Sequence, residues 1–71
     1  MQFSDLGKDI RRILLEHWTL TEIEDRLSDP EYFFDQVVIP RLAYLRRSGE
    51  EIPTLRLGRM QDGTFRVFLN P

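Results

Sequence analysis

The sequence contains no cysteine, and it has only one histidine and four glycines among its 71 residues. The absence of cysteine excludes a disulfide framework and a thiolate metal site, and it favours a reducing, cytoplasmic environment. His17 alone cannot supply the nitrogen ligands of a zinc site. The glycines are scattered and form no phosphate-binding loop. We therefore expect no metal and no cofactor.

Long hydrophobic runs are also missing, because no apolar stretch approaches the roughly 18 residues that a membrane span needs. Charged residues occur from Asp5 onward, so we expect no signal peptide and no membrane contact. Neighbouring carboxylates such as Glu22 and Glu24 point apart on a helix, which gives general acid–base catalysis no geometry. We therefore predict that the protein is not an enzyme.

The short chain limits the architecture to one domain. A chain of this length buries only roughly 60% of the surface that its unfolded form exposes, which leaves room for one small core within residues 1–71. Five Phe, two Tyr and one Trp supply apolar material that disordered chains lack. We therefore expect a single folded domain.

Charge is distributed unevenly. Residues 1–35 carry four basic and nine acidic side chains, a net charge of −5, whereas residues 36–71 carry six basic and three acidic side chains, a net charge of +3. The basic residues of the second half are all arginine, whose planar guanidinium binds phosphate or carboxylate bidentately. This half favours a polyanionic partner; the alternative is that its arginines are solvated or pair with the acidic half.

Two amphipathic helices are predicted first, over about residues 4–17 and 20–27, because apolar residues recur there every three or four positions. Thr19 and Glu22 have the spacing of a capping box that starts the second helix. Trp18 lies at a staple position beside it and is expected in the core.

A third helix is predicted over about residues 30–48, with Asp29 as its cap and Gly49 as a left-handed C-cap. Pro40 inside it predicts a kink, or a break near Ile39. At about 100° per residue, the face opposite the core carries Phe33, Gln36, Pro40, Ala43 and Arg47, flanked by Tyr32 and Tyr44. For a solvent-facing side of a helix, this outer face is unusually apolar.

Alternating apolar residues then predict a β-hairpin over about residues 54–69, with Asp62-Gly63 in its turn. A type I turn with a bulge at Gly63 builds one apolar face, and it predicts the pairs Leu55–Leu69, Leu57–Val67 and Arg59–Phe65. Arg56, Gly58, Arg66 and Phe68 then face outward. The predicted fold class is therefore α+β, with three or possibly four helices followed by a two-stranded antiparallel hairpin.

This order of elements resembles a winged helix-turn-helix domain. The segment Arg41-Leu42-Ala43-Tyr44-Leu45-Arg46-Arg47-Ser48-Gly49-Glu50-Glu51-Ile52 resembles the end of a recognition helix in that superfamily, where the chain leads into the wing. Residues 19–27 resemble the preceding helix, and residues 54–69 resemble the wing. The resemblance implies that the third helix lies in the major groove of DNA and that the wing contacts the backbone. The residues that it assigns to DNA binding are Gln36, Arg41, Tyr44 and Arg47 on the helix, and Arg56, Arg59 and Arg66 on the wing.

The start of the third helix, Glu31-Tyr32-Phe33-Phe34-Asp35, departs from DNA-reading helices because it is acidic and aromatic. Carboxylates repel phosphates, so either the helix enters the groove only from Gln36 onward or the fold serves another purpose. The net charge of −2 also differs from the basic balance of most nucleic-acid binders.

Two functions are therefore expected. The first is a small DNA-binding winged-helix protein, a transcriptional regulator or accessory factor of phage or plasmid type, which binds duplex DNA as a homodimer. The second is a non-enzymatic adaptor or inhibitor that contacts another protein through the apolar outer face of the third helix. The residues expected in that protein interface are Tyr32, Phe33 and Pro40.

Overall fold

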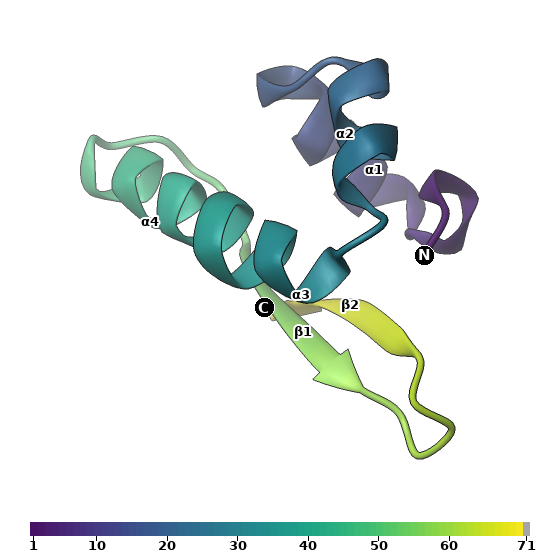
Figure 1. The fold of residues 1–71 in the computed structure, drawn as a ribbon. Coiled ribbons are helices and arrows are strands. Elements are labelled where there is room, and N and C mark those ends of the chain that lie inside the picture. Colours follow the sequence, from purple (N-terminus) through teal and green to yellow (C-terminus); the bar gives the residue numbers. More distant parts are fainter. Residues whose placement is uncertain (71) are drawn as a thin grey trace.

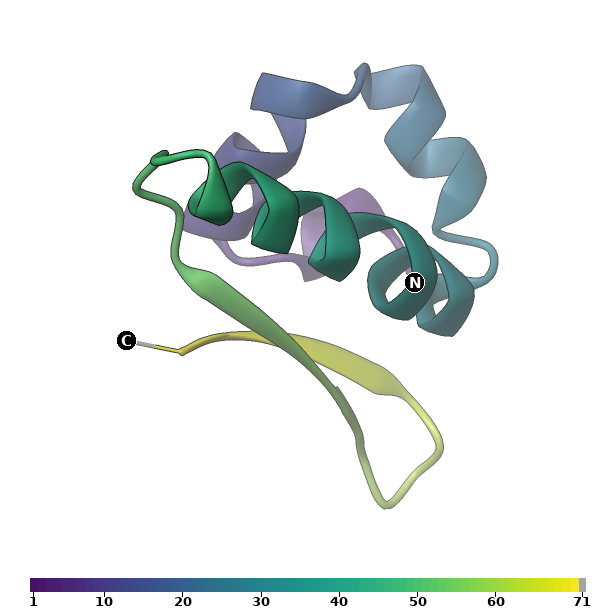
Figure 2. The same ribbon diagram turned by 90° about the vertical axis from the view of Figure 1, so that its left-hand side faces the viewer.

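The computed structural model describes residues 1–70, which form an α+β arrangement of helices followed by a two-stranded antiparallel hairpin (Figure 1). The elements are the 3-10 turn η1 (Phe3–Asp5), α1 (Lys8–His17), α2 (Leu20–Arg26), α3 (Pro30–Tyr32), the π-helical turns η2 (Phe33–Val38), α4 (Ile39–Arg47), β1 (Thr54–Arg59) and β2 (Phe65–Asn70). In Figure 2, α4 lies in front with the hairpin beneath it, and α1 and α2 lie behind. The order of helices and hairpin is the one that the sequence predicts.

The first helix begins later than its periodicity predicts, at Lys8 instead of residue 4. The side chain of Asp5 accepts a hydrogen bond from the backbone N–H of Gln2 (2.8 Å), which closes the separate turn η1. Leu6 then enters the core with an extended backbone, and Gly7 is extended too. The chain therefore leaves the helical path before α1 starts.

The predicted caps of the next two helices are confirmed. The Thr19 hydroxyl accepts from the N–H of Glu22 (3.2 Å), and the Glu22 carboxylate accepts from the N–H of Thr19 (3.4 Å), so the capping box is closed in both directions. Asp29 accepts from the N–H of Tyr32 (3.3 Å), with Pro30 in the first helical position. Both caps satisfy N–H groups that a helix start otherwise leaves without partners.

The third helix widens before Pro40 and does not break. Phe33, Val38 and Ile39 all keep right-handed helical backbone angles, so α3, η2 and α4 follow one continuous path. The N–H of Ile39 donates to the carbonyl of Phe34, five residues earlier, which defines the wide turn. Proline has no N–H to donate and clashes with a regular turn before it, so the wide turn accommodates Pro40. The helix ends at Arg47 with Ser48 as its C-cap, and Gly49 then has the predicted left-handed conformation, with a φ of +101°.

Phe33 is buried, and its predicted place on the outer face of the helix is wrong. Its side chain is 1% exposed and packs edge-on against the rings of Trp18 (5.9 Å between centroids) and Phe34 (5.4 Å). The connection between α1 and α2 brings Trp18 to this flank of the helix. Phe33 and Phe34 precede the buried Val38 by five and four residues. In the wide turn both spacings bring a side chain back to the same side of the helix, so both rings lie on the buried side with Val38.

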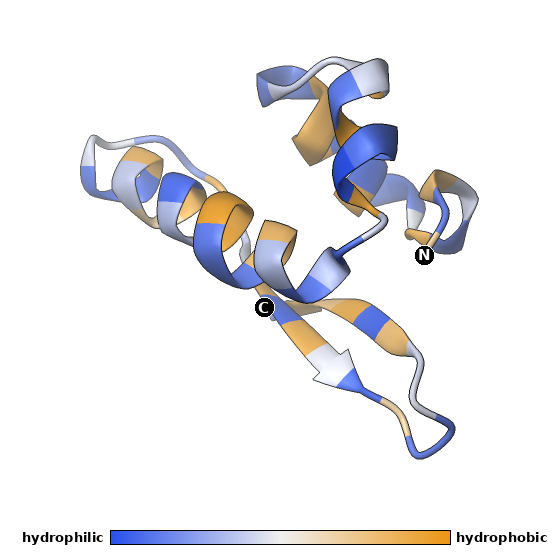
Figure 3. Cartoon of the chain, in the orientation of Figure 1, coloured by the Kyte–Doolittle hydropathy of each residue, from blue (hydrophilic) through white to orange (hydrophobic). Residues whose placement is uncertain are grey.

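One cluster of buried residues joins the helices to the hairpin. Its fully buried members come from α1 (Leu14), α2 (Ile23), the α2–α3 connection (Leu27), η2 (Phe33, Phe34, Val38) and α4 (Leu42), and Leu55 of β1 packs with them. Trp18 is partly buried against this cluster, as predicted. Figure 3 shows the outward side of α2 and the tip of the hairpin as hydrophilic. The core therefore holds α4 against both the helices behind it and β1 beneath it.

The hairpin has the predicted register. Leu55 pairs with Leu69, Leu57 with Val67, and Arg59 with Phe65. The turn closes with a hydrogen bond from the N–H of Met60 to the carbonyl of Thr64 (2.7 Å), and Gly63 takes the positive φ (+86°) that the bulge requires.

Candidate nucleic-acid interface

The four helix residues predicted to contact DNA are all exposed. Gln36 lies on η2, and Arg41, Tyr44 and Arg47 lie on α4. The guanidinium of Arg41 lies 5.7 Å from the centroid of the Tyr44 ring, within range of a cation–π contact that holds both side chains on one patch. We call these four residues the helix face.

The predicted wing arginines occupy two different faces of the hairpin. The register places Arg56 and Arg66 on the outer face, together with Gly58 and Phe68. Arg56 lies 4.6 Å over the Phe68 ring. The same ring approaches Gly58 so closely that an added Cβ would meet it at 2.8 Å, so glycine is required there for Phe68 to keep this position. The outer face therefore presents two arginines on a strand pair braced by an aromatic ring.

Arg59 lies on the opposite, inner face of the hairpin. Its guanidinium is 5.0 Å over the ring of Phe65, and one of its nitrogens (Nη2) is 3.3 Å from Oε2 of Glu31 at the start of the third helix. The two paired residues are 28 positions apart, so no local sequence pattern signals this contact. The seven predicted DNA-binding residues therefore do not share one face, and Arg59 is occupied by a carboxylate.

The remaining predicted arginines have no carboxylate partner. Within residues 1–70 the ion pairs are Arg12–Asp9 and Arg59–Glu31, both exposed at the surface. Arg46 is half-buried and donates to the backbone carbonyl of Pro53 (3.2 Å), which ties α4 to the segment that leads into β1. Four arginines of the basic half are thus exposed and unpaired in the described chain: Arg41, Arg47, Arg56 and Arg66.

A negative charge lies at the tip of the hairpin. The carboxylate of Asp62 accepts hydrogen bonds from the hydroxyl (2.6 Å) and the backbone N–H (3.0 Å) of Thr64. These bonds stabilise the ionised form and hold the pKa of Asp62 below its ordinary value of 3.8. The tip therefore keeps its carboxylate charged at neutral pH, and the positive groups of the hairpin lie behind it on the strands.

Two of the three residues predicted for a protein interface are at the surface. Tyr32 is 56% exposed and Pro40 is exposed as well, whereas Phe33 belongs to the core. Ala43, expected on the same outer face, is half-buried. Tyr44 is 57% exposed, so the exposed apolar side chains of the helix are two tyrosines and a proline.

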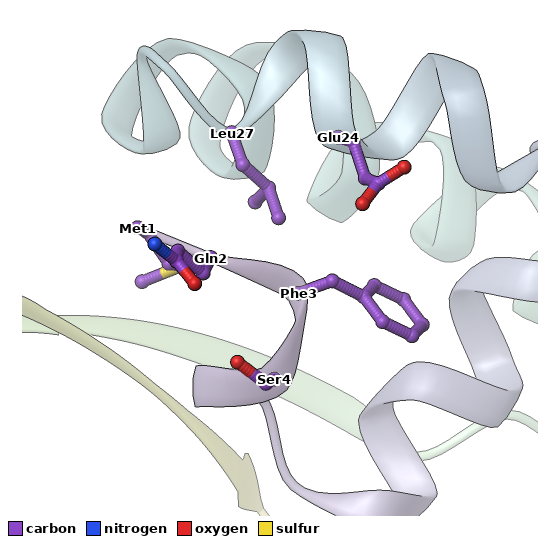
Figure 4. A pocket seen from close by; sticks show the side chains of 6 residues that line it. All are labelled: Met1, Gln2, Phe3, Ser4, Glu24 and Leu27. Atoms are coloured by element: carbon purple, nitrogen blue, oxygen red, sulfur yellow. The ribbon is translucent and has the colours of Figure 1, made fainter.

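A hollow of about 390 Å³ between η1 and α2 lies apart from these residues (Figure 4). Its lining comes from the N-terminal residues and from Glu24 and Leu27, and it includes none of the ten predicted site residues. Within residues 1–70 no cluster of three His, Cys, Asp or Glu side chains could hold a metal ion, and no helix is long and apolar enough to cross a membrane. The candidate DNA-binding residues therefore lie at the surface of the third helix and of the hairpin.

Comparisons with protein-family models, curated proteins and solved structures give no match for this chain.

Proposed function

We propose that the protein is a small winged-helix DNA-binding protein that regulates transcription or assists another DNA-binding factor. The fold inference rests on the order of its elements, a third helix followed by a hairpin that packs beneath it. The observation that carries the function is the set of four exposed arginines without carboxylate partners, two on α4 and two on the outer face of the hairpin. Each can contact a phosphate without first breaking an ion pair.

The acidic start of the third helix is compatible with this proposal. Glu31 is already turned toward Arg59, and Asp35 comes before the first proposed DNA contact, Gln36. The helix face then enters the groove from Gln36 to Arg47, and the hairpin supplies Arg56 and Arg66 to the backbone. Affinity comes mainly from the phosphate contacts of the four arginines, with Gln36 as the side chain suited to base edges.

The test is fluorescence anisotropy of a labelled random-sequence duplex at about 50 and about 200 mM salt. Four phosphate contacts give a log–log slope of about −3.6, which corresponds to a loss of affinity of roughly 100-fold between these two salt concentrations. Removing Arg41 and Arg47 together (R41Q/R47Q) reduces the magnitude of that slope by about 2.

The matched control removes two cations from the acidic half, Lys8 and Arg26, which lie on α1 and α2. The variant K8Q/R26Q carries the same change in net charge as R41Q/R47Q, so it separates a local contact from the overall charge. The proposal is rejected if the two double variants change the salt slope equally, or if the wild-type chain does not bind the duplex at low salt.

A second candidate function is contact with another protein through the same helix. It is supported by the exposure of Tyr32 and Tyr44, because amphipathic aromatic side chains are frequent anchors of protein interfaces. This function requires that Tyr32→Ser weakens association with the partner while the free energy of unfolding is unchanged. Contact with another protein is favoured over DNA binding if the chain does not bind the duplex at low salt.

A further inference from the structure

The strand β2 has an unpaired edge. Within residues 1–70 the sheet contains only β1 and β2, and no other backbone group bonds to residues 65–70. The helix α4 packs on β1, so β1 is the more covered of the two strands. The N-terminal residues Met1 and Asp5 lie across a hollow of about 580 Å³ from Phe65 and Arg66, without a backbone hydrogen bond between them.

The hydrogen-bond pattern identifies the free backbone groups. The N–H of Met60 donates to the carbonyl of Thr64, so residues 60 and 64 form a hydrogen-bonded pair. Bonded and non-bonded pairs alternate along an antiparallel ladder. Arg66, Phe68 and Asn70 therefore bond to β1, whereas the N–H and C=O groups of Phe65, Val67 and Leu69 point toward the free edge.

This edge has little of the protection that strands at a sheet edge usually carry. Natural edge strands are blunted by lysine, proline, a bulge or short length. The six residues of β2, Phe-Arg-Val-Phe-Leu-Asn, include no lysine and no proline, and Arg66 is their only charge. In Figure 3 most of the visible part of β2 is hydrophobic, with a hydrophilic patch between apolar segments. Leu69 is 37% exposed although it lies on the inner, apolar face.

We propose that a second copy of this chain pairs with this edge, β2 against β2 in antiparallel orientation, to make a continuous four-stranded sheet with two-fold symmetry. Val67 lies opposite the partner's Val67, and Phe65 lies opposite the partner's Leu69. This register pairs all three residues whose backbone groups are free, Phe65, Val67 and Leu69. A shift by two residues toward the C-terminus leaves the free backbone groups of Phe65 without a partner within the strand Phe65–Asn70.

The outer face of the same register is also self-complementary. Arg66 comes opposite the partner's Phe68, in a non-bonded pair, where side chains are closest. Arginine against phenylalanine is the pairing that the hairpin already uses twice, Arg56 over Phe68 and Arg59 over Phe65. A shift by two residues in the other direction sets Arg66 against the partner's Arg66, a repulsion between like charges.

This register favours a second copy of the chain over an unrelated strand, because β2 is complementary to itself: both residues of every cross-strand pair come from the segment Phe65–Asn70. The inner face buries Leu69 against the partner's Phe65, and the outer face leaves Arg56 and Arg66 at the surface. This inference does not rest on DNA binding, and the two are tested separately.

The first experiment is sedimentation equilibrium of the full chain over a range of concentrations. We expect a reversible dimer, and a rise of at least about tenfold in its dissociation constant for Leu69→Lys, since the partner's Phe65 would cover an ammonium group. The matched control is Leu15→Lys, which replaces another exposed leucine, on α1 (48% exposed). A wild-type chain that stays monomeric, or equal effects of the two variants, overturns the proposal.

The second experiment uses the absence of cysteine from the natural chain. In a bonded pair the Cα atoms are about 5.5 Å apart, within the range that a disulfide spans. Val67→Cys lies on the two-fold axis and is expected to give a disulfide-linked dimer under mild oxidation, whereas Arg56→Cys, exposed on β1, stays largely monomeric. Equal cross-linking of the two variants overturns the register, and no cross-linking of Val67→Cys overturns the pairing.

Discussion

The indole of Trp18 meets the ring of Phe33 edge-on, with 5.9 Å between the ring centroids and 74° between the planes. This contact joins the connection between α1 and α2 to the start of the third helix. It continues through Phe33 to Phe34, whose rings also meet edge-on. Edge-to-face aromatic pairs contribute about 0.5–1.5 kcal/mol beyond the burial of their area. The aromatic row therefore helps to position the helix that carries the candidate site.

The burial of Phe33 predicts a large effect of its removal. Phe33→Ala is expected to lower the free energy of unfolding by about 3–5 kcal/mol, because it leaves a cavity beside Trp18 and Phe34. Urea denaturation followed by Trp18 fluorescence measures the loss. The neighbouring variant Tyr32→Ala, at a 56% exposed position, is expected to stay within about 0.5 kcal/mol of the wild type. Equal losses for the two variants contradict the assignment of Phe33 to the core.

The capping box of α2 predicts a smaller and local effect. Thr19→Ala removes the acceptor of the Glu22 N–H and is expected to cost about 0.5–2 kcal/mol. A loss of about 1 kcal/mol lowers the melting temperature of a domain of this size by about 4–8 °C. Thr21→Ala is the control, since Thr21 is exposed in the same helix and Ala favours helix. A melting temperature unchanged by Thr19→Ala would show that the cap is not used in solution.

Local signals predicted most of the fold. The caps at Thr19 and Asp29, the left-handed Gly49 and the hairpin register all depend on residues close in sequence, and all are confirmed. Each has a local physical cause, either an acceptor for a free N–H, a glycine at positive φ, or the need for one apolar face.

The errors arise where residues distant in sequence meet. Phe33 is buried because Trp18, fifteen positions earlier, covers it, and Arg59 is tied to Glu31, which is 28 positions away. A helical wheel with a uniform turn cannot include either neighbour, nor the wide turn before Pro40. The exposure of the helix face could be predicted from the sequence. The sequence did not show that Arg59 pairs with a carboxylate while Arg56 and Arg66 do not.

The hairpin tip predicts a measurable dependence on Thr64. Hydrogen bonds from Thr64 lower the pKa of Asp62 in the folded state. The stabilisation that they give is complete above the ordinary value of 3.8 and is lost as the pH falls through the lower folded pKa.

In Thr64→Ala the hydroxyl donor is absent and the backbone N–H of residue 64 remains, so the pKa of Asp62 rises toward its ordinary value. An NMR titration of the Asp62 carboxyl carbon measures the change. The control is Thr54→Ala, at the far end of the hairpin, which leaves the Asp62 titration where it is in the wild type. A Thr64→Ala titration that matches the wild type contradicts the bonds.

The pair Glu31–Arg59 predicts a gain in affinity on removal of the acid, if the proposed DNA binding holds. The Glu31 carboxylate lies 3.3 Å from Arg59 and competes with phosphate for the same guanidinium. An exposed pair of this kind contributes about 0.2–1 kcal/mol, so Glu31→Gln is expected to strengthen duplex binding by about 1.4- to 5-fold. Glu24→Gln on α2 removes the same charge away from the hairpin and is the control. The gain depends on Arg59, so Glu31→Gln has no further effect in an Arg59→Gln background. An equal gain in that background means that Glu31 acts through general repulsion of phosphate and does not restrain Arg59.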